Sequence, residues 1–286
     1  MTDAGEHEGY VLDPESPVEM ARLINLDRFM TKGMGGSLVG VENLSPLHNI
    51  LDMACGPGGW VLDVAFEQPN VEVAGVDISE IMISYANERA QTQRIPNASF
   101  GVMDITKPLD FADGSFDLVN ARFLFSVLTQ EQWPGFIAEC TRLLRPGGML
   151  RLTELIDGGA TNSPAKEQLH GFFCQALQRV KHGFSVNGRS IGMTIMLPRF
   201  LREAGYQQVQ HKMHALEVSA GTEVYSDFYR NSEIIYLLAK PLFVNTGVTT
   251  DDEFDQTYQQ MLIELRSDNF TGMWHYMTAL GVKPLS

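Results

Sequence analysis

A glycine turn and the acidic residue that follows it are the residues of this chain best suited to chemistry. The turn, Gly56-Pro57-Gly58-Gly59, separates the apolar segment 49–54 from a helical pattern that begins at Trp60. Glycine adopts positive φ and lets a ligand approach the backbone closely, and the N–H groups at the helix start then face that ligand. Asp77 ends the next apolar segment, where a carboxylate accepts hydrogen bonds from a ribose diol. These residues together predict a nucleotide-type site.

The spacing of the glycines excludes two common nucleotide motifs. The turn lacks the Gly-Lys-Ser/Thr ending of triphosphate-binding loops. It also lacks the Gly-x-Gly-x-x-Gly spacing of dinucleotide sites. The segments that follow must therefore identify the ligand.

Five segments occur in an order that resembles the class I S-adenosylmethionine (SAM) methyltransferases. They are residues 51–59 (LDMACGPGG), Asp77, 100–105 (FGVMDI) followed by 109–111, 116–120 (FDLVN) and 143–148 (LLRPGG). The likeness is close over residues 48–155 and loose over 190–217. It implies a Rossmann-like fold, SAM as the cofactor and methyl transfer as the reaction.

The resemblance also implies which residues hold the cofactor. Methionine, ribose and adenine are expected at the ends of the first, second and third strands, against Asp52, Ala54, Gly56, Gly58, Asp77, Ile78, Met82, Met103, Asp104 and Ile105. Asp104 has an alternative role as a loop acid that accepts bonds from backbone N–H groups. Asn120 ends the fourth strand, on the edge that faces the methyl group in this family. Arg122 either forms a structural salt bridge or contacts the SAM carboxylate, for which Arg28 is another candidate.

Methyl transfer by direct displacement requires few catalytic side chains, so the sequence carries no strong catalytic motif for it. The protein mainly holds nucleophile, methyl carbon and sulfur in line, and a base is needed only when the nucleophile carries a proton. Candidate catalytic residues follow the fifth strand, on the rim over the predicted pocket: Glu154, Asp157 and His170. His211 and His214 on one strand would face opposite sides, and no other pair has metal-ligand spacing, so no metal is expected.

The elements that must position these residues alternate between strand and helix patterns. This alternation predicts an α/β fold with a doubly wound, seven-stranded sheet that is parallel except for an antiparallel last strand. The expected strands are 49–54, 71–77, 99–103, 116–121, 149–154, 206–217 and 273–281. The expected helices are 17–30, 58–68, 79–93, 129–144, 163–181 and 194–204, and Ser79 is the expected N-cap of the third.

Four parts of the chain follow from this pattern. Residues 1–40 are expected to form a loosely packed tail, then a helical lid capped by Ser16, then a glycine-rich turn over 31–40. Residues 41–219 are expected to form the SAM-binding core. Residues 220–268 read as a helical insertion in the final hairpin, which 269–286 close. Two alternatives stay open: the lid helix docks on a neighbouring subunit, and the insertion is either a substrate cap or an oligomer interface.

Composition and charge limit the classes of partner and the cellular setting that are expected for this protein. The formal net charge is −14 and no dense basic run occurs, so nucleic acid is not an expected partner. The Asp/Asn-Pro-Pro-Tyr/Phe motif of amino-methylating relatives is missing after Asn120, and so is the Pro-Cys pair of cytosine enzymes. Three isolated cysteines fit a reducing, cytoplasmic setting. The N-terminus shows no signal peptide, and no apolar run suits a membrane.

These observations lead to one predicted function with two alternatives. The chain is expected to be a SAM-dependent methyltransferase that acts on a small, largely apolar metabolite, by O-, N- or C-methylation in secondary metabolism. A protein or RNA methyltransferase is the alternative among enzymes. A SAM-binding partner subunit without turnover is the alternative from another class. A homo-oligomer, through the N-terminal helix or the insertion, is also expected.

Overall fold

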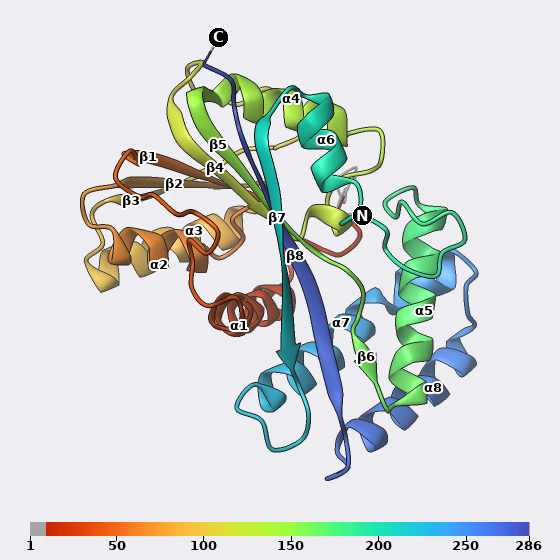
Figure 1. Cartoon of the computed structure of the whole chain (residues 1–286). Coiled ribbons are helices and arrows are strands. Elements are labelled where there is room, and N and C mark those ends of the chain that lie inside the picture. Colours follow the sequence, from red (N-terminus) through yellow and green to blue (C-terminus); the bar gives the residue numbers. More distant parts are fainter. Residues whose placement is uncertain (1–9, 286) are drawn as a thin grey trace, which may run out of the picture.

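A central β-sheet carries the predicted architecture (Figure 1). In the computed structural model, which describes residues 10–285, the strand order is β3-β2-β1-β4-β5-β8, with β7 beside β8. The strands β1 to β5 pair in parallel, and β8 is antiparallel to both β5 and β7. The strands are β1 Asn49–Met53, β2 Glu72–Asp77, β3 Ala98–Val102, β4 Phe116–Arg122, β5 Leu144–Leu155, β6 Ala160–Thr161, β7 Gln207–Glu217 and β8 Gly272–Val282. The expected count of seven is short by β6, a two-residue strand that pairs with the start of β8.

Helices cover the sheet in positions that the chain order sets. They are α1 Pro17–Met34, α2 Gly59–Glu67, α3 Glu80–Gln93, α4 Trp133–Leu143, α5 Pro164–Arg179, α6 Leu197–Glu203, α7 Tyr225–Asn245 and α8 Asp251–Leu265, with the 3-10 helix η1 at Leu124–Ser126. Helices α2 and α3 pack on β2 and β3, whereas α4 and α6 pack toward β5, β7 and β8. Two predicted caps are confirmed: Ser16 accepts from the N–H of Glu19, and Ser79 from that of Met82.

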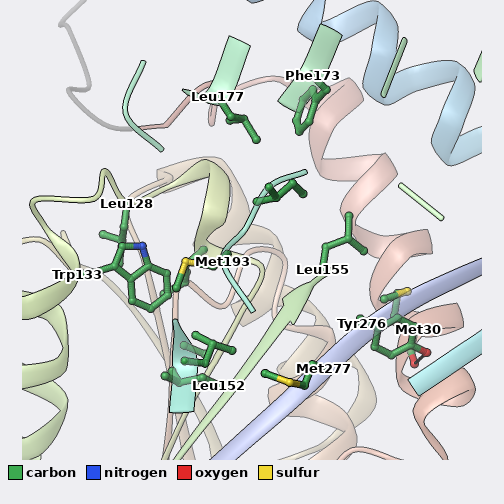
Figure 2. Close-up of a cluster of buried hydrophobic side chains, with 14 of the residues drawn as sticks. Met30, Leu128, Trp133, Leu152, Leu155, Phe173, Leu177, Met193, Tyr276 and Met277 are labelled. Atoms are coloured by element: carbon green, nitrogen blue, oxygen red, sulfur yellow. Dashed lines mark hydrogen bonds between the residues drawn. The ribbon is translucent and has the colours of Figure 1, made fainter. Parts of the chain in front are cut away.

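Apolar side chains from distant elements form the core between these layers. Figure 2 shows part of it, where Met30 of α1 lies beside Tyr276 of β8. Trp133 stacks on Phe200, with ring centroids 5.7 Å apart, and so joins α4 to α6. A second buried cluster, centred on Trp60 and Ile50, lies under α2 and α3. The strand ends that carry the predicted site are therefore fixed by packing on both faces of the sheet.

The N-terminal segment differs from its prediction in two places. Residues 1–9 of the expected loose tail lie outside the described residues, but Leu12 and Pro14 are buried, and the N–H of Val11 donates to the carbonyl of Ser126. Helix α1 extends four residues past its expected end at Met30 and so occupies the first part of the expected turn, as far as Met34. Gly33 lies against Tyr276, and a Cβ there would come within 2.8 Å of the Tyr276 hydroxyl. Glycine serves helix packing at this position, and the turn begins only at Gly35, where φ is +93°.

Helices α7 and α8 are inserted between β7 and β8, as the sequence predicted. The long strands β7 and β8 extend past the rest of the sheet toward α5, α7 and α8 (Figure 1). Helix α7 packs against both α1 and α5, and α8 packs against α5 and α7. The insertion and the N-terminal helix therefore meet over the same end of the sheet.

Candidate functional site

One cavity opens where β1, β2 and β4 end, and it continues beneath α1, α5 and α7. We call the part at the strand ends the cofactor half; it is lined by Asp52, Ala54, Cys55, Gly56, Pro57, Gly59, Asp77, Ile78, Met82, Met103, Asp104 and Ile105. We call the part beneath the helices the acceptor half; it is lined by Leu155, Gly158, Lys166, His170, Phe173, Phe228, Asn231, Ser232, Ile235, Tyr236 and Trp274. The first group contains most of the predicted cofactor residues, and the second contains one predicted catalytic residue, His170.

The glycine turn between β1 and α2 requires its glycines for two reasons. Gly56 and Gly58 have φ values of +54° and +75°, in the left-handed region that side chains disfavour. A Cβ on Gly58 would lie 2.5 Å from the Phe100 ring, so Gly58 shapes the turn from outside the cavity lining. Gly56 lines the cavity, and a side chain there would enter the space that a ligand uses. The turn thus presents bare backbone to the cofactor half.

Asp77, at the end of β2, ties the turn to the second strand. Its carboxylate accepts from the N–H of Gly56 at 2.8 Å and from the N–H of Ser79 at 3.0 Å. Burial raises the pKa of Asp77, and the bonds from Ser79 and Gly56 oppose that shift. A carboxylate has about four lone-pair positions, so Asp77 keeps acceptor capacity for ribose hydroxyls.

Asp52 heads a polar ladder across three neighbouring strands. It faces Asn120 in register, and Asn120 faces Arg151. The Asn120 amide donates to Asp52 at 2.7 Å, and Arg151 donates to the Asn120 oxygen at 2.6 Å. Burial raises the pKa of Asp52 to about 7, against the opposing effects of Arg122 and Asn120. Asn120 is fully buried and does not line the cavity, so it lies behind Asp52 instead of at the expected cofactor surface.

The two arginine candidates for the SAM carboxylate lie in different places. Arg122 lines the cavity, pairs with Asp27 of α1 at 2.6 Å and donates to the Thr31 hydroxyl at 3.2 Å. This salt bridge is one of the two roles that the sequence left open. Arg28 points away: its side chain is 70% exposed and pairs with Asp227 on α7, so the structure does not bring it to the cavity. Asp27 lines the cavity in its place, and no sequence motif marked it.

Adenine contacts are expected at the end of β3. Met103, Asp104 and Ile105 line the cavity there, as does Met82 from the first turn of α3. Asp104 accepts from the backbone N–H of Thr106 at 2.9 Å and pairs with Lys107 at 2.9 Å. Asp104 thus makes the loop contacts of its alternative role while it also lines the cavity.

The catalytic candidates fall in different environments. Glu154 is 1% exposed and lies outside the cavity lining, where its carboxylate accepts from the N–H groups of Leu124 at 2.6 Å and Phe125 at 3.4 Å. Burial raises its pKa to about 8, against those two bonds. Asp157 is also absent from the lining and accepts from the N–H of Gly159 at 2.8 Å. The structure therefore assigns both carboxylates to loop geometry instead of to the expected place over the acceptor.

His170 reaches the cavity but with one nitrogen already engaged. Its Nε2 accepts from the N–H of Gly158 at 2.8 Å, and the Cys174 sulfur lies 3.2 Å from the same nitrogen. Burial, with a smaller effect of Lys166, lowers the pKa of His170 to about 3. The ring is therefore neutral at physiological pH, and a neutral ring that accepts at Nε2 carries its proton on Nδ1. Because Nε2 already accepts a bond, the geometry does not support the predicted base, and the catalytic role of His170 stays a prediction.

A buried polar network joins the lid helix to the insertion. The Tyr10 hydroxyl donates to Glu19 at 2.7 Å, and Arg22 donates to Glu19 at 2.6 Å and to Asn231 of α7 at 2.8 Å. Tyr10, Arg22 and Asn231 all line the cavity. Sequence reasoning missed this network because Arg22 and Asn231 lie 209 positions apart, although a Glu and an Arg three residues apart on one helix is a readable local signal.

The geometry fits the cofactor that the sequence predicted. The positive-φ glycines, the backbone N–H groups at the start of α2 and the buried carboxylate of Asp77 form a cradle that a Cβ at Gly56 would obstruct. Residues 10–285 contain no cluster of His, Cys, Asp or Glu able to hold a metal ion. In the same part of the chain, no helix combines the length and apolarity needed to cross a bilayer.

Comparison with known proteins agrees with this geometry. A family described as "Methyltransferase domain" matches residues 50–148. The "Uncharacterized methyltransferase C1B3.06c" of Schizosaccharomyces pombe is 30% identical over 226 residues, 75% of this chain and 75% of that protein. The "Secondary metabolism regulator laeA" of Aspergillus niger is 28% identical over 180 residues, 61% of this chain and 44% of that protein, so the chain spans less than half of that relative.

Solved structures extend the likeness to the fold. The YcgJ protein from Bacillus subtilis aligns with a TM-score of 0.55 over 88% of this chain and 98% of that one, at 17% identity. The chain belongs to the class I SAM-dependent methyltransferase family.

Proposed function

We propose that this protein transfers a methyl group from SAM to a small, largely apolar metabolite. The observation that carries the proposal is the continuity of this cavity, because it joins a nucleotide cradle to a chamber walled by Phe173, Phe228, Tyr236 and Trp274. When bound, SAM supplies an electrophilic methyl group on a sulfonium. The chain's own residues then have to bind, orient and enclose the acceptor, which a covered apolar chamber does.

The position of the lid and the insertion supports a small acceptor. Leu23, Leu26 and Met30 of α1 line the cavity, as do Phe228 and Ile235 of α7. Both helices therefore cover the reaction space, which favours the cap over the interface as the role of the insertion. A macromolecular acceptor would need a wide, open approach, and the charge of −14 also opposes RNA. Homo-oligomerisation and a cytoplasmic location stay predictions.

The lid role has a direct test in hydrogen exchange. Backbone exchange across Pro17–Met34 should slow when SAM or S-adenosylhomocysteine is added, because Asp27 and Arg122 connect this helix to the cofactor half. Equal exchange with and without ligand contradicts the lid.

A regulator without turnover is the second candidate, and likeness to the laeA regulator favours it. One experiment separates the two. The protein is incubated with methyl-labelled SAM and fractions of a metabolite extract, and both S-adenosylhomocysteine and labelled product are measured. The proposed enzyme forms the two in equal amounts in at least one fraction. Tight SAM binding by calorimetry with no S-adenosylhomocysteine in any fraction supports the regulator instead.

A further inference from the structure

A buried lysine in the acceptor half forms no salt bridge with any of residues 10–285. Lys166 lies in the first turn of α5, is 2% exposed and lines the cavity. Its ammonium donates to the carbonyl of Gly158 and lies 5.4 Å from the centre of the Phe228 ring. Within residues 10–285, the lysines that form salt bridges are Lys32, Lys107, Lys181 and Lys240.

The surroundings of Lys166 leave its charge incompletely balanced. Burial lowers the pKa of Lys166 to about 8, and the charges of Asp157 and Glu167 oppose that shift. The Phe228 ring offers a cation–π contact, and Gly158 offers one carbonyl, but an ammonium has three N–H donors. A buried cation that no salt bridge neutralises is unfavourable, and an anionic ligand in direct contact relieves that state. A cationic amine in the same place would be repelled, strongly so at low dielectric.

One helical turn further on, His170 adds a second donor. Lys166 and His170 are four residues apart on α5 and therefore lie on the same face of the helix. Both side chains bind Gly158, Lys166 through the carbonyl and His170 through the N–H. Gly158 has to be glycine, because a Cβ there would lie 2.5 Å from Nδ1 of His170. The loop between β5 and β6 thus fixes an ammonium and a neutral imidazole at one wall of the chamber.

We infer that the acceptor half binds an ionised oxygen, a phenolate or enolate on a flat apolar body, held by Lys166 and His170. This inference rests on the proposed function and names its substrate class. Phe173, Phe228 and Trp274 supply the apolar walls for the body of the acceptor. The oxygen lone pair attacks the methyl carbon, the carbon–sulfur bond breaks with its electron pair left on sulfur, and an ether forms. No proton moves in this step, since the acceptor binds already ionised and Lys166 keeps its protons.

The test uses 4-nitrophenol, whose ionised form absorbs visible light and whose neutral form does not. The full chain is saturated with S-adenosylhomocysteine, and 4-nitrophenol, the neutral ether 4-nitroanisole and the cation 4-nitrobenzylamine are titrated in turn. The experiment is run at a pH where free 4-nitrophenol is mostly un-ionised. We expect 4-nitrophenol to bind tightest and the phenolate band to appear on binding.

Two variants show whether Lys166 is responsible. Lys166→Met keeps the length and fills the apolar site, so it should fold, and it should weaken phenolate binding roughly tenfold or more. Lys240→Met is the matched control, because Lys240 also lies over a phenylalanine ring, Phe254 at 5.3 Å, but outside the cavity lining. Lys240→Met should bind 4-nitrophenol as the wild type does.

The outcomes separate this inference from the proposed function. Equal affinity for the ether, tighter binding of the amine, or no phenolate band in protein that binds S-adenosylhomocysteine overturns the ionised-oxygen acceptor and leaves methyl transfer standing. Unchanged phenolate binding in Lys166→Met overturns the role of Lys166. Failure to bind S-adenosylhomocysteine at all contradicts the proposed function itself.

Discussion

The two halves of the cavity are built from different kinds of information. The cofactor half comes from short segments at the ends of strands: 52–59, 77–82 and 103–105. The acceptor half comes from side chains on two helices, α5 and α7, from Leu155 of β5 and Trp274 of β8 and from the loop at Gly158, and Tyr10 and Arg22 of the N-terminal segment line the same cavity. The first half depends on backbone conformation at strand ends, and the second depends on how separate helices pack. A ligand site made of turns can be read locally, whereas a site made of helix packing cannot.

The largest effect should come from a side chain at Gly56. Gly56→Val forces a β-branched residue into φ of +54° and directs it into the cofactor half, so SAM affinity should fall roughly a hundredfold or more. Calorimetry measures this loss. Gly135→Val is the control, since a Cβ at Gly135 meets nothing within 4 Å. If Gly56→Val binds SAM as the wild type does, the turn is not the cofactor cradle.

A smaller loss of SAM affinity is expected when Asp77 is replaced. Asp77→Ala removes an acceptor for ribose hydroxyls and also releases the N–H of Gly56, so SAM affinity should fall about tenfold or more. The exposed Asp110→Ala serves as control. Calorimetry that finds unchanged affinity in Asp77→Ala rejects the ribose assignment.

Gly56 and Asp77 also show how much of the site could be predicted from the sequence. The alternation of strands and helices and the Ser16 and Ser79 caps followed from periodicity and local motifs, and most of the cofactor lining followed from the resemblance of short segments to a known family, because each depends on neighbours in sequence. Arg28 was chosen as a carboxylate candidate by helix membership alone, and only the packing of α1 on α7 shows that it faces Asp227. Lys166 carried no motif, and its burial depends on Gly158 and Phe228, which meet it only in the folded chain.

The acceptor half has its own test in neighbouring residues of α7. Phe228 lines the cavity and Tyr229 does not. Phe228→Leu loses the ring contacts with Trp274 and Lys166, so kcat/KM for the acceptor should fall about fivefold while SAM affinity holds. Tyr229→Phe, which removes a buried hydroxyl without a partner in residues 10–285, should leave both values unchanged. If instead either change alters the mass seen by light scattering and spares the kinetics, the insertion is an oligomer interface.

The smallest effect on activity should come from Glu154, although sequence reasoning placed it among the catalytic residues. Its carboxyl group is buried outside both halves of the cavity and accepts from two backbone N–H groups of η1. Glu154→Gln keeps an oxygen that accepts from the N–H of Leu124. The turnover rate of this variant should therefore stay within about twofold of the wild type, with ~0.4 kcal/mol as the corresponding limit. A loss of two orders of magnitude restores Glu154 as the base.

Glu154→Gln should nevertheless change how the stability of the protein depends on pH. The pKa of Glu154 is about 8 in the folded protein and near 4.5 in the unfolded chain. Between these values the folded state holds a proton that the unfolded state has lost, so the contribution of Glu154 to the unfolding free energy falls as pH rises from about 4.5 to 8, and it is constant above. The amide in Glu154→Gln cannot titrate, so the melting temperature of this variant relative to the wild type should rise across that window. A difference that stays level from pH 5 to 8 contradicts the buried, protonated carboxyl, and a level difference together with lost turnover points to an ionised base.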